Sequence, residues 1–123
     1  MPVSAVRGAT TSPANTKEAI HGAVEELIRQ LSAANGLVPD EIVAAFFTMT
    51  PDLDAAFPAY AARRLGWDAV PLLGAVETPV PGFPPAMIRV LVLVEREKRE
   101  RLKPVYLNGT ERLRPDLFEG ASP

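Results

Sequence analysis

Apolar residues between positions 20 and 31 recur at the spacing of an amphipathic helix. They comprise Ile20, Val24, Leu27, Ile28 and Leu31, with Ala23 and Ala34 widening the stripe. Asn15, with Glu18 three positions further on, resembles a capping box and predicts where this helix begins. Gly36 predicts its end, because glycine readily adopts the left-handed conformation that closes helices. His21 lies off the centre of the stripe, so we expect it on the protein surface.

Shorter runs that are rich in β-branched and aromatic residues predict strands. They cover residues 3–7, 42–49, 69–77, 87–95 and 105–107. The run at 87–95, MIRVLVLVE, is apolar at almost every position, as expected for a strand that is covered on both faces. The stretch Gly8-Ala9-Thr10-Thr11 follows the first run and predicts a turn there.

The remaining segments are predicted to be a second helix and several loops. Residues 54–65 predict a short helix, because Pro58 suits its first turn and Gly66 follows its end. Residues 78–85 contain four prolines and predict a stiff loop. Residues 95–103, EREKRERLK, are charged throughout and predict either a helix or a solvated turn. A helical turn is expected at 111–114 and a mobile tail at 115–123.

This order of elements predicts an α/β (α+β) fold formed by a single domain over residues 1–123. We expect a mixed sheet of four to five strands with the helices on one face. Such a sheet leaves its second face open, which conflicts with the apolar strand at 87–95. The sheet must therefore either curl on itself or pack against another subunit.

Composition narrows the possible chemistry. The chain has 123 residues, no cysteine and one histidine, which excludes disulfides, thiolate metal sites and a cysteine nucleophile. A net charge of −2 gives no general reason to expect nucleic acid or an anionic membrane as a partner. The first 20 residues lack the apolar core of a secretory signal, and no apolar run is long enough to span a membrane. We expect a cytoplasmic protein.

Two charged residues stand in or beside apolar strands. Arg89 interrupts the run at 87–95, and an arginine there should meet a carboxylate, a ligand or solvent at a cleft. A structural salt bridge, or a side chain that reaches out to solvent, is the alternative. Glu77 follows the apolar stretch before it and is a candidate partner for Arg89, a ligand-binding carboxylate, or an ordinary charge at a strand end.

Charge is unevenly distributed, and the familiar catalytic motifs are absent. Residues 1–85 carry five basic and nine acidic side chains, whereas residues 86–114 carry eight basic and four acidic ones. The basic stretch suits either an anionic ligand or a charged surface. The sequence contains no GxGxxG, P-loop, HExxH or GxSxG motif. These features favour a binding module for a small anion, or an enzyme that works by positioning and electrostatics.

Several stretches, in order and at compatible spacing over nearly the whole chain, resemble the small monofunctional chorismate mutases of the trimeric α/β (Bacillus-like) class. The matching stretches are Arg7-Gly8-Ala9-Thr10-Thr11, the run TPDLDAAFPA at 50–59, Gly66-Trp67, Val70-Pro71-Leu72, Glu77, Ile88-Arg89-Val90, Val105-Tyr106-Leu107 and Leu113-Arg114-Pro115-Asp116-Leu117. Any one of them is a weak signal, but together they are specific.

The resemblance implies an isomerase that converts chorismate to prephenate by a Claisen rearrangement in aromatic amino-acid biosynthesis. Such an enzyme restricts the substrate's conformation and stabilises charge on the ether oxygen, without a cofactor or a metal. The resemblance also implies a homotrimeric pseudo-α/β-barrel with sites at the subunit interfaces, and no nucleic-acid or membrane partner. A non-catalytic trimeric binding module for a small cyclic carboxylate is the alternative.

The resemblance also assigns roles to residues. Arg89 should reach the ether oxygen, Glu77 should accept a hydrogen bond from the ring hydroxyl, and Arg7 should bind a substrate carboxylate with help from Tyr106. The other substrate-binding positions are Phe57, Ala59 and Arg63, which approach from the adjacent subunit, Leu73 and Gly74, which line the pocket, and Leu113 and Arg114, which belong to a closing segment.

Two positions depart from the family pattern. Tyr60 stands where relatives can carry a lysine near the substrate, so one positive charge is missing. Gly74 stands where relatives can have a polar or thiol side chain near the ring hydroxyl, so only backbone is available for that contact. Neither change touches Arg89 or Glu77, and we therefore expect activity to be retained.

Overall fold

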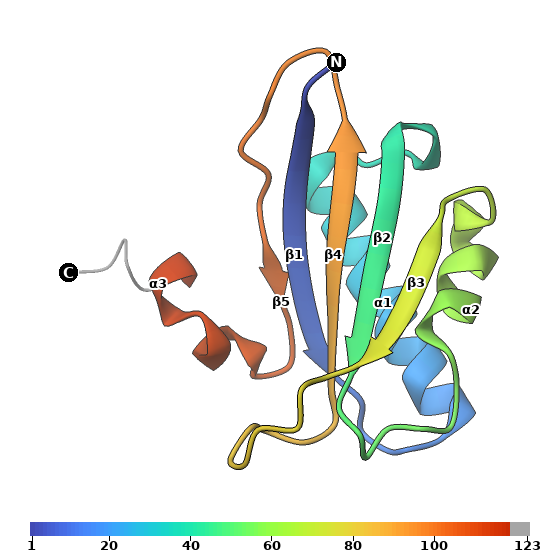
Figure 1. The fold of residues 1–123 in the computed structure, drawn as a ribbon, viewed down its shortest axis with the longest axis vertical. Coiled ribbons are helices and arrows are strands. Elements are labelled where there is room, and N and C mark those ends of the chain that lie inside the picture. Colours follow the sequence, from blue (N-terminus) through green and yellow to red (C-terminus); the bar gives the residue numbers. More distant parts are fainter. Residues whose placement is uncertain (119–123) are drawn as a thin grey trace.

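The computed structural model describes residues 1–118, which form one mixed sheet with its main helices on one face (Figure 1). The strands are β1 (Val3–Thr11), β2 (Ile42–Met49), β3 (Leu72–Val76), β4 (Met87–Glu95) and β5 (Val105–Tyr106), and the helices are α1 (Lys17–Asn35), α2 (Pro58–Ala62) and α3 (Pro115–Phe118). Short helical turns span Pro39–Glu41, Arg63–Trp67 and Thr110–Leu113. The predicted α+β class is confirmed. The part of the predicted mobile tail at 119–123 lies outside the described residues.

The five strands lie in the order β3-β2-β4-β1-β5. Strand β4 is antiparallel to both of its neighbours, whereas β3 and β5 run parallel to β2 and β1. The helix-facing side chains of β4, from Ile88 to Val94, are buried in the same core cluster as the apolar stripe of α1. On its other face, Arg89 and Leu91 are exposed. The prediction that both faces of this strand are covered is therefore wrong within one protomer.

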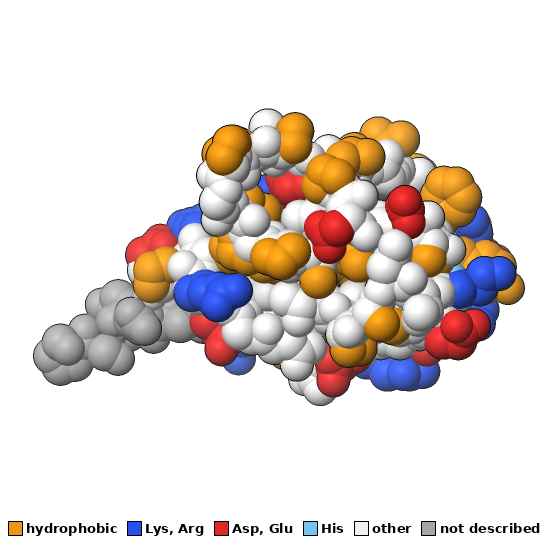
Figure 2. Space-filling model, turned by 90° about the horizontal axis from the view of Figure 1, so that it is seen from below, with side chains coloured by type: hydrophobic (Ala, Val, Ile, Leu, Met, Phe, Trp, Pro, Cys, Tyr) orange, Lys and Arg blue, Asp and Glu red, His pale blue; other side chains and the backbone are white. Residues whose placement is uncertain are grey.

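The open face of the sheet carries exposed apolar side chains. The pairing register places Leu73 of β3 beside Phe46 of β2, Phe46 beside Leu91 of β4, and Leu91 beside Arg7 of β1. All four of these side chains are exposed. Exposed Val80 belongs to the loop at the lower end of the molecule, where Figure 2 shows hydrophobic side chains interspersed with charged ones.

The start of α1 differs from the predicted capping box. The hydroxyl of Thr16, not the side chain of Asn15, accepts a hydrogen bond from the N–H of Ala19 at 3.1 Å. Asn15 instead binds the loop before α2, because its side-chain oxygen accepts from the N–H groups of Asp54 and Ala55. The predicted helix end is confirmed, since Gly36 adopts φ +60° and closes the helix.

His21 is buried rather than on the surface. Helix α2 packs across the flank of α1, and the ring of Tyr60 stacks on His21 with 5.0 Å between ring centroids. The helical repeat placed His21 off the centre of one apolar stripe, but it gave no sign of a second helix on that flank. Helix α2 is confirmed but is shorter than the predicted 54–65, since it begins at Pro58 and ends at Ala62. A turn follows it in which Gly66 adopts φ +98°.

The predicted turn at residues 8–11 lies inside a strand, because β1 continues to Thr11 between β4 and β5. A Cβ atom on Gly8 would lie 3.1 Å from the Leu27 side chain, 3.2 Å from Val90 and 3.3 Å from the Val105 carbonyl oxygen. The glycine therefore allows α1 and β5 to approach β1 closely and does not mark a turn. Strand β3 is also shorter than predicted and begins at Leu72.

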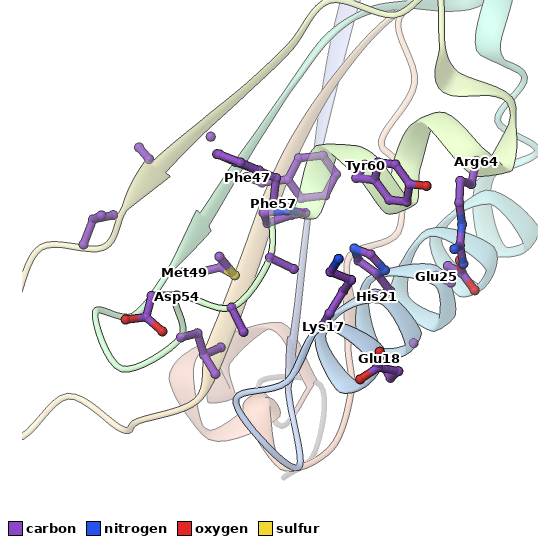
Figure 3. Close-up of a pocket in the computed structure, with 18 residues that line it drawn as sticks. Lys17, Glu18, His21, Glu25, Phe47, Met49, Asp54, Phe57, Tyr60 and Arg64 are labelled. Carbon is purple, nitrogen blue, oxygen red and sulfur yellow. The ribbon is translucent and has the colours of Figure 1, made fainter.

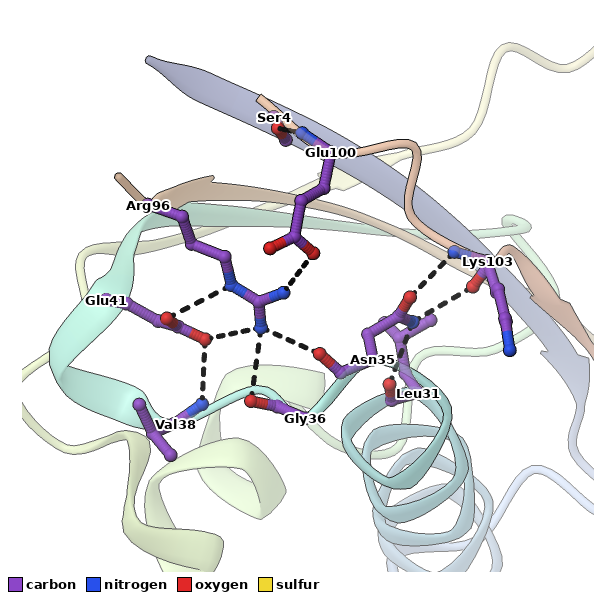
Figure 4. A network of polar contacts seen from close by, with 9 residues as sticks. All are labelled: Ser4, Leu31, Asn35, Gly36, Val38, Glu41, Arg96, Glu100 and Lys103. Atoms are coloured by element: carbon purple, nitrogen blue, oxygen red, sulfur yellow. Dashed lines mark hydrogen bonds and ion pairs between the residues drawn. The ribbon is translucent and has the colours of Figure 1, made fainter. Parts of the chain in front are cut away.

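The charged segment after β4 is not helical, so that alternative is wrong. Arg96 holds the segment instead (Figure 4). Its guanidinium donates two hydrogen bonds to Glu41, at 2.7 and 3.1 Å, and one to Glu100 at 2.8 Å. It also donates to the carbonyl oxygens of Asn35 and Gly36 at the end of α1. This Arg96 network fixes the connection that leads to β5.

Candidate active site

Glu77 and Arg89 form an ion pair on the open face of the sheet. Arg89 Nε lies 2.7 Å from Glu77 Oε2, and Arg89 Nη2 lies 2.6 Å from Glu77 Oε1, so both carboxylate oxygens accept from the guanidinium. The Glu77 side chain is 11% exposed, whereas that of Arg89 is 44% exposed. The hypothesis that Glu77 is the partner of Arg89 is confirmed.

Two residues that sequence reasoning missed support this pair. The hydroxyl of Thr48 in β2 donates to Glu77 Oε2 at 2.9 Å. Phe83, from the proline-rich loop, lies with its ring centroid 5.6 Å from the Arg89 guanidinium carbon, at the distance of a cation–π contact. Thr48 is the register partner of Arg89, a relation that exists only once the strands pair. No signal along the chain connects either residue to the site.

The environment of Glu77 keeps it ionised. The hydrogen bond from Arg89 is the main cause that lowers the pKa of Glu77, and the hydroxyl of Thr48 lowers it further. Partial burial acts in the opposite direction and does not cancel these effects. The site therefore presents a fixed carboxylate next to a guanidinium that still has exposed surface.

Arg7 and Tyr106 lie on the same side of the sheet as this pair. Ala9 of β1 is paired with Arg89 on one side and with Tyr106 on the other. Arg7 is exposed and lies two positions back along β1, which places it on the same face as Arg89. Tyr106 is buried. The structure therefore places Arg7, Arg89 and Tyr106, from three strands, and Glu77, from the loop after β3, on one side of the sheet.

The closing segment expected at residues 113 and 114 lies next to this group. Arg114 makes two hydrogen bonds to Asp116, at 3.0 and 2.8 Å. Hydrogen bonding from Arg114 is the main cause that lowers the pKa of Asp116, and the positive charge of Arg7 contributes to the same effect. Tyr106 in turn contributes to the raised pKa of Arg114. Leu113 is half-buried in the preceding turn.

The other predicted site residues lie around α2 and on β3. Phe57, at the start of α2, is 79% exposed, and Arg63 at its end is exposed. Ala59 is half-buried in α2. Leu73 is exposed on the open face, at the edge strand. Gly74, its neighbour in β3, is paired with the buried Phe47 and so belongs to the helix-facing side of the sheet, opposite to Arg89.

A cavity of about 1020 Å³ lies between α1, the segment around α2 and β3 (Figure 3). Phe57 and Gly74 line it, whereas Arg7, Glu77 and Arg89 do not. Tyr60 also lines the cavity, but its ring is packed between His21 and the guanidinium of Arg64, which forms an ion pair with Glu25. Tyr60 is therefore part of the packing of α2 on α1.

The described residues hold no metal-binding cluster of three or more histidine or acidic side chains. None of their helices is long and apolar enough to cross a membrane.

Comparison with known proteins decides the family. Residues 3–117, almost the whole chain, match the chorismate mutase type I family. The chain belongs to this family. The expectation of an isomerase that converts chorismate to prephenate in aromatic amino-acid biosynthesis is thereby confirmed. The alternative of a non-catalytic binding module is not supported by this match.

Individual relatives agree with the chorismate mutase assignment. The chain is 49% identical over 117 residues to chorismate mutase AroH of Thermus thermophilus, covering 94% of this chain and 96% of that one. It is 36% identical over 119 residues to chorismate mutase AroH of Bacillus subtilis (strain 168), covering 95% and 94%. A solved chorismate mutase from Clostridium thermocellum superposes with a TM-score of 0.84 at 43% identity, covering 88% of this chain and 97% of that one.

Proposed function

We propose that Arg89 is the residue that stabilises the transition state of the chorismate rearrangement. In this reaction the ether C–O bond breaks while a C–C bond forms within the same molecule, and negative charge grows on the ether oxygen. Arg89 uses Nε and Nη2 to bind Glu77, and its Nη1 makes no hydrogen bond within the described residues. The bidentate pair on an open sheet face is the observation that carries the proposal, because it holds a donor in place before substrate arrives.

We assign the remaining polar groups to substrate binding. Arg7 lies on the same face, with its charge available for a substrate carboxylate. Tyr106 of β5 is the register partner of Ala9, two positions along β1 from Arg7. Glu77 is ionised and so suits the role of acceptor for the ring hydroxyl. Leu113 and Arg114 lie next to this group and are the proposed closing segment.

We further propose that the active enzyme is a homotrimer with its sites between subunits. Two features support this proposal. The open face exposes apolar side chains such as Phe46 and Leu91, which a neighbouring subunit would cover. The family resemblance assigns Phe57, Ala59 and Arg63 to the site, yet they lie in and around α2, and the cavity that Phe57 lines does not include Arg89. A second copy would supply them to the Arg89 site. A cytoplasmic location stays a prediction, which cell fractionation would test.

Substitution of Arg89 tests its role directly. We expect Arg89→Ala to lower kcat/KM for chorismate at least about a hundredfold, and Arg89→Lys to recover only part of that loss because an ammonium lacks the planar fork. Loss of chorismate absorbance measures the rate. Arg99→Ala removes an exposed arginine outside the site and serves as the matched control. An Arg89→Ala enzyme with near-normal kcat would refute the role.

Mixing two inactive variants tests the shared site. If Arg89 and Arg63 come from different subunits, then Arg89→Ala and Arg63→Ala protomers, dissociated and reassembled together at equal amounts, should form intact sites. Random assembly makes about a quarter of the sites intact. Sedimentation of the same sample checks that trimers form. Activity no higher than the mean of the two parent variants would show that each site is built from a single chain.

A further inference from the structure

The hydroxyl of Thr48 is the only neutral side-chain group that donates a hydrogen bond to the Glu77 carboxylate among the interactions of residues 1–118. Thr48 lies in β2, where its register partners are Ala75 of β3 and Arg89 of β4. It therefore stands between the strand that leads into Glu77 and the strand that carries Arg89. Its side chain is half-buried on the same face as both groups.

Three side-chain donor atoms, two from Arg89 and one from Thr48, are distributed unequally over the two oxygens of Glu77. Among these side-chain donors, Arg89 Nη2 bonds to Oε1 at 2.6 Å, whereas Arg89 Nε, at 2.7 Å, and Thr48, at 2.9 Å, both bond to Oε2. The backbone N–H of Thr78 also contributes to the lowered pKa of Glu77. The Thr48 donor differs from the guanidinium because a β-branched side chain on a strand has few rotamers. One oxygen of Glu77 is therefore tied to the sheet itself, independently of Arg89.

This tie matters when substrate binds. Arg89 is the more exposed partner, on a long side chain. Its Nη1 can donate to substrate, but any shift of the guanidinium toward the reacting oxygen strains the bonds from Nε and Nη2 to Glu77. Without Thr48, Arg89 would be the only side chain that holds this carboxylate among the described residues, and the carboxylate would move or take up a proton more readily. With Thr48 in place, Oε2 keeps a donor while Arg89 engages the reacting oxygen.

We propose that Thr48 is a positioning residue for the rearrangement, acting through Glu77 to keep this carboxylate fixed during turnover. The inference rests on the proposed roles of Glu77 and Arg89. A hydroxyl that donates to a carboxylate also favours its ionised form, and this agrees with the contribution of Thr48 to the lowered pKa of Glu77.

Thr48→Val and Thr48→Ser together test this inference. Valine keeps the shape and β-branching of threonine but removes the donor, whereas serine keeps the donor. We expect Thr48→Val to lower kcat about tenfold or more, with a smaller effect on KM, and Thr48→Ser to restore most of the rate. The acidic limb of the kcat/KM profile should move to higher pH in Thr48→Val, because Glu77 takes up a proton more readily, and should return in Thr48→Ser.

The outcomes separate this inference from the proposed function. If Arg89→Ala and Glu77→Gln abolish turnover while Thr48→Val has wild-type kcat and an unshifted acidic limb, only the inference about Thr48 is overturned. If Thr48→Val and Thr48→Ser lose activity equally, the hydroxyl is not the cause and the inference is again wrong. If Arg89→Ala and Glu77→Gln remain active, the proposed function itself fails. Urea unfolding of each variant confirms that the compared enzymes are folded.

Discussion

Replacing Arg96 by methionine should destabilise the protein far more than the loss of an ordinary surface charge. Methionine retains much of the apolar stem but removes the guanidinium that joins the end of α1, Glu41 and the segment after β4. The Arg96 side chain is only 14% exposed, so water cannot fully replace its partners. We therefore expect the free energy of unfolding to fall.

The size of the effect follows from the partners in the Arg96 network. Glu100 is 48% exposed, so its pair with Arg96 contributes little. Glu41 accepts two hydrogen bonds in a more sheltered position, and the carbonyl groups of Asn35 and Gly36 lose a charged donor. Hydrogen bonds to a charged group contribute about 1.5–3 kcal/mol when well shielded. We take about 1.5 kcal/mol for the bonds to Glu41 and about the same for the bonds to the two carbonyl groups, which gives a loss of about 3 kcal/mol.

Urea unfolding at fixed protein concentration measures this loss, because association would otherwise change the apparent stability. Glu100→Gln is the matched control, since it removes only the exposed pair and should cost about 0.5 kcal/mol or less. The pH dependence supplies a second signature. The hydrogen bond from Arg96 is the main cause that lowers the pKa of Glu41 in the folded protein.

A lowered folded-state pKa gives stability that is present above the unfolded pKa of about 4.3 and is lost as pH falls through the folded pKa. The difference between wild type and Arg96→Met should therefore be largest near neutral pH and shrink in acid, with the carbonyl contribution remaining. A loss at pH 7 no larger than that of Glu100→Gln, about 0.5 kcal/mol or less, would refute this account of Arg96.

Three further substitutions test the local structure by their urea midpoints. Gly8→Ala should destabilise the protein by about 1–3 kcal/mol, because its Cβ would press on Leu27, Val90 and the Val105 carbonyl. Gly22→Ala, in the interior of α1 with no neighbour within 4 Å of the added Cβ, should instead stabilise it by about 0.5–1 kcal/mol. Thr16→Ala should cost about 1 kcal/mol by removing the cap of α1, and an unchanged midpoint would show that the cap is not used in solution.

Elements whose signal lies within one continuous stretch of sequence were predicted correctly. The stripe from Ile20 to Leu31 and the stop at Gly36 located α1, and the continuous apolar run located β4. These signals are local, because helix and strand periodicity and glycine conformation depend on residues a few positions apart. The sequence also predicted Glu77 as a candidate partner of Arg89, since the two charges stand in or beside apolar strands that one loop connects.

The same local reasoning failed wherever a distant element set a residue's environment. Gly8 looked like the start of a turn, but it is required by the close approach of α1 and β5. His21 looked exposed until α2 covered it. The capping box assigned to Asn15 gave way to a contact with a loop 39 residues further on. In each case the deciding neighbour is far away in the sequence.

The sequence by itself determined the class of fold, the main elements and, through the family resemblance, the reaction. The tertiary structure alone decided which groups meet: the donation from Thr48 to Glu77, the network around Arg96, and the separation of Arg89 from Phe57 within one protomer. The physical reason is that these arrangements depend on strand order and pairing register. The whole sheet fixes both by the burial of its helix-facing side chains, and no short stretch of sequence encodes them.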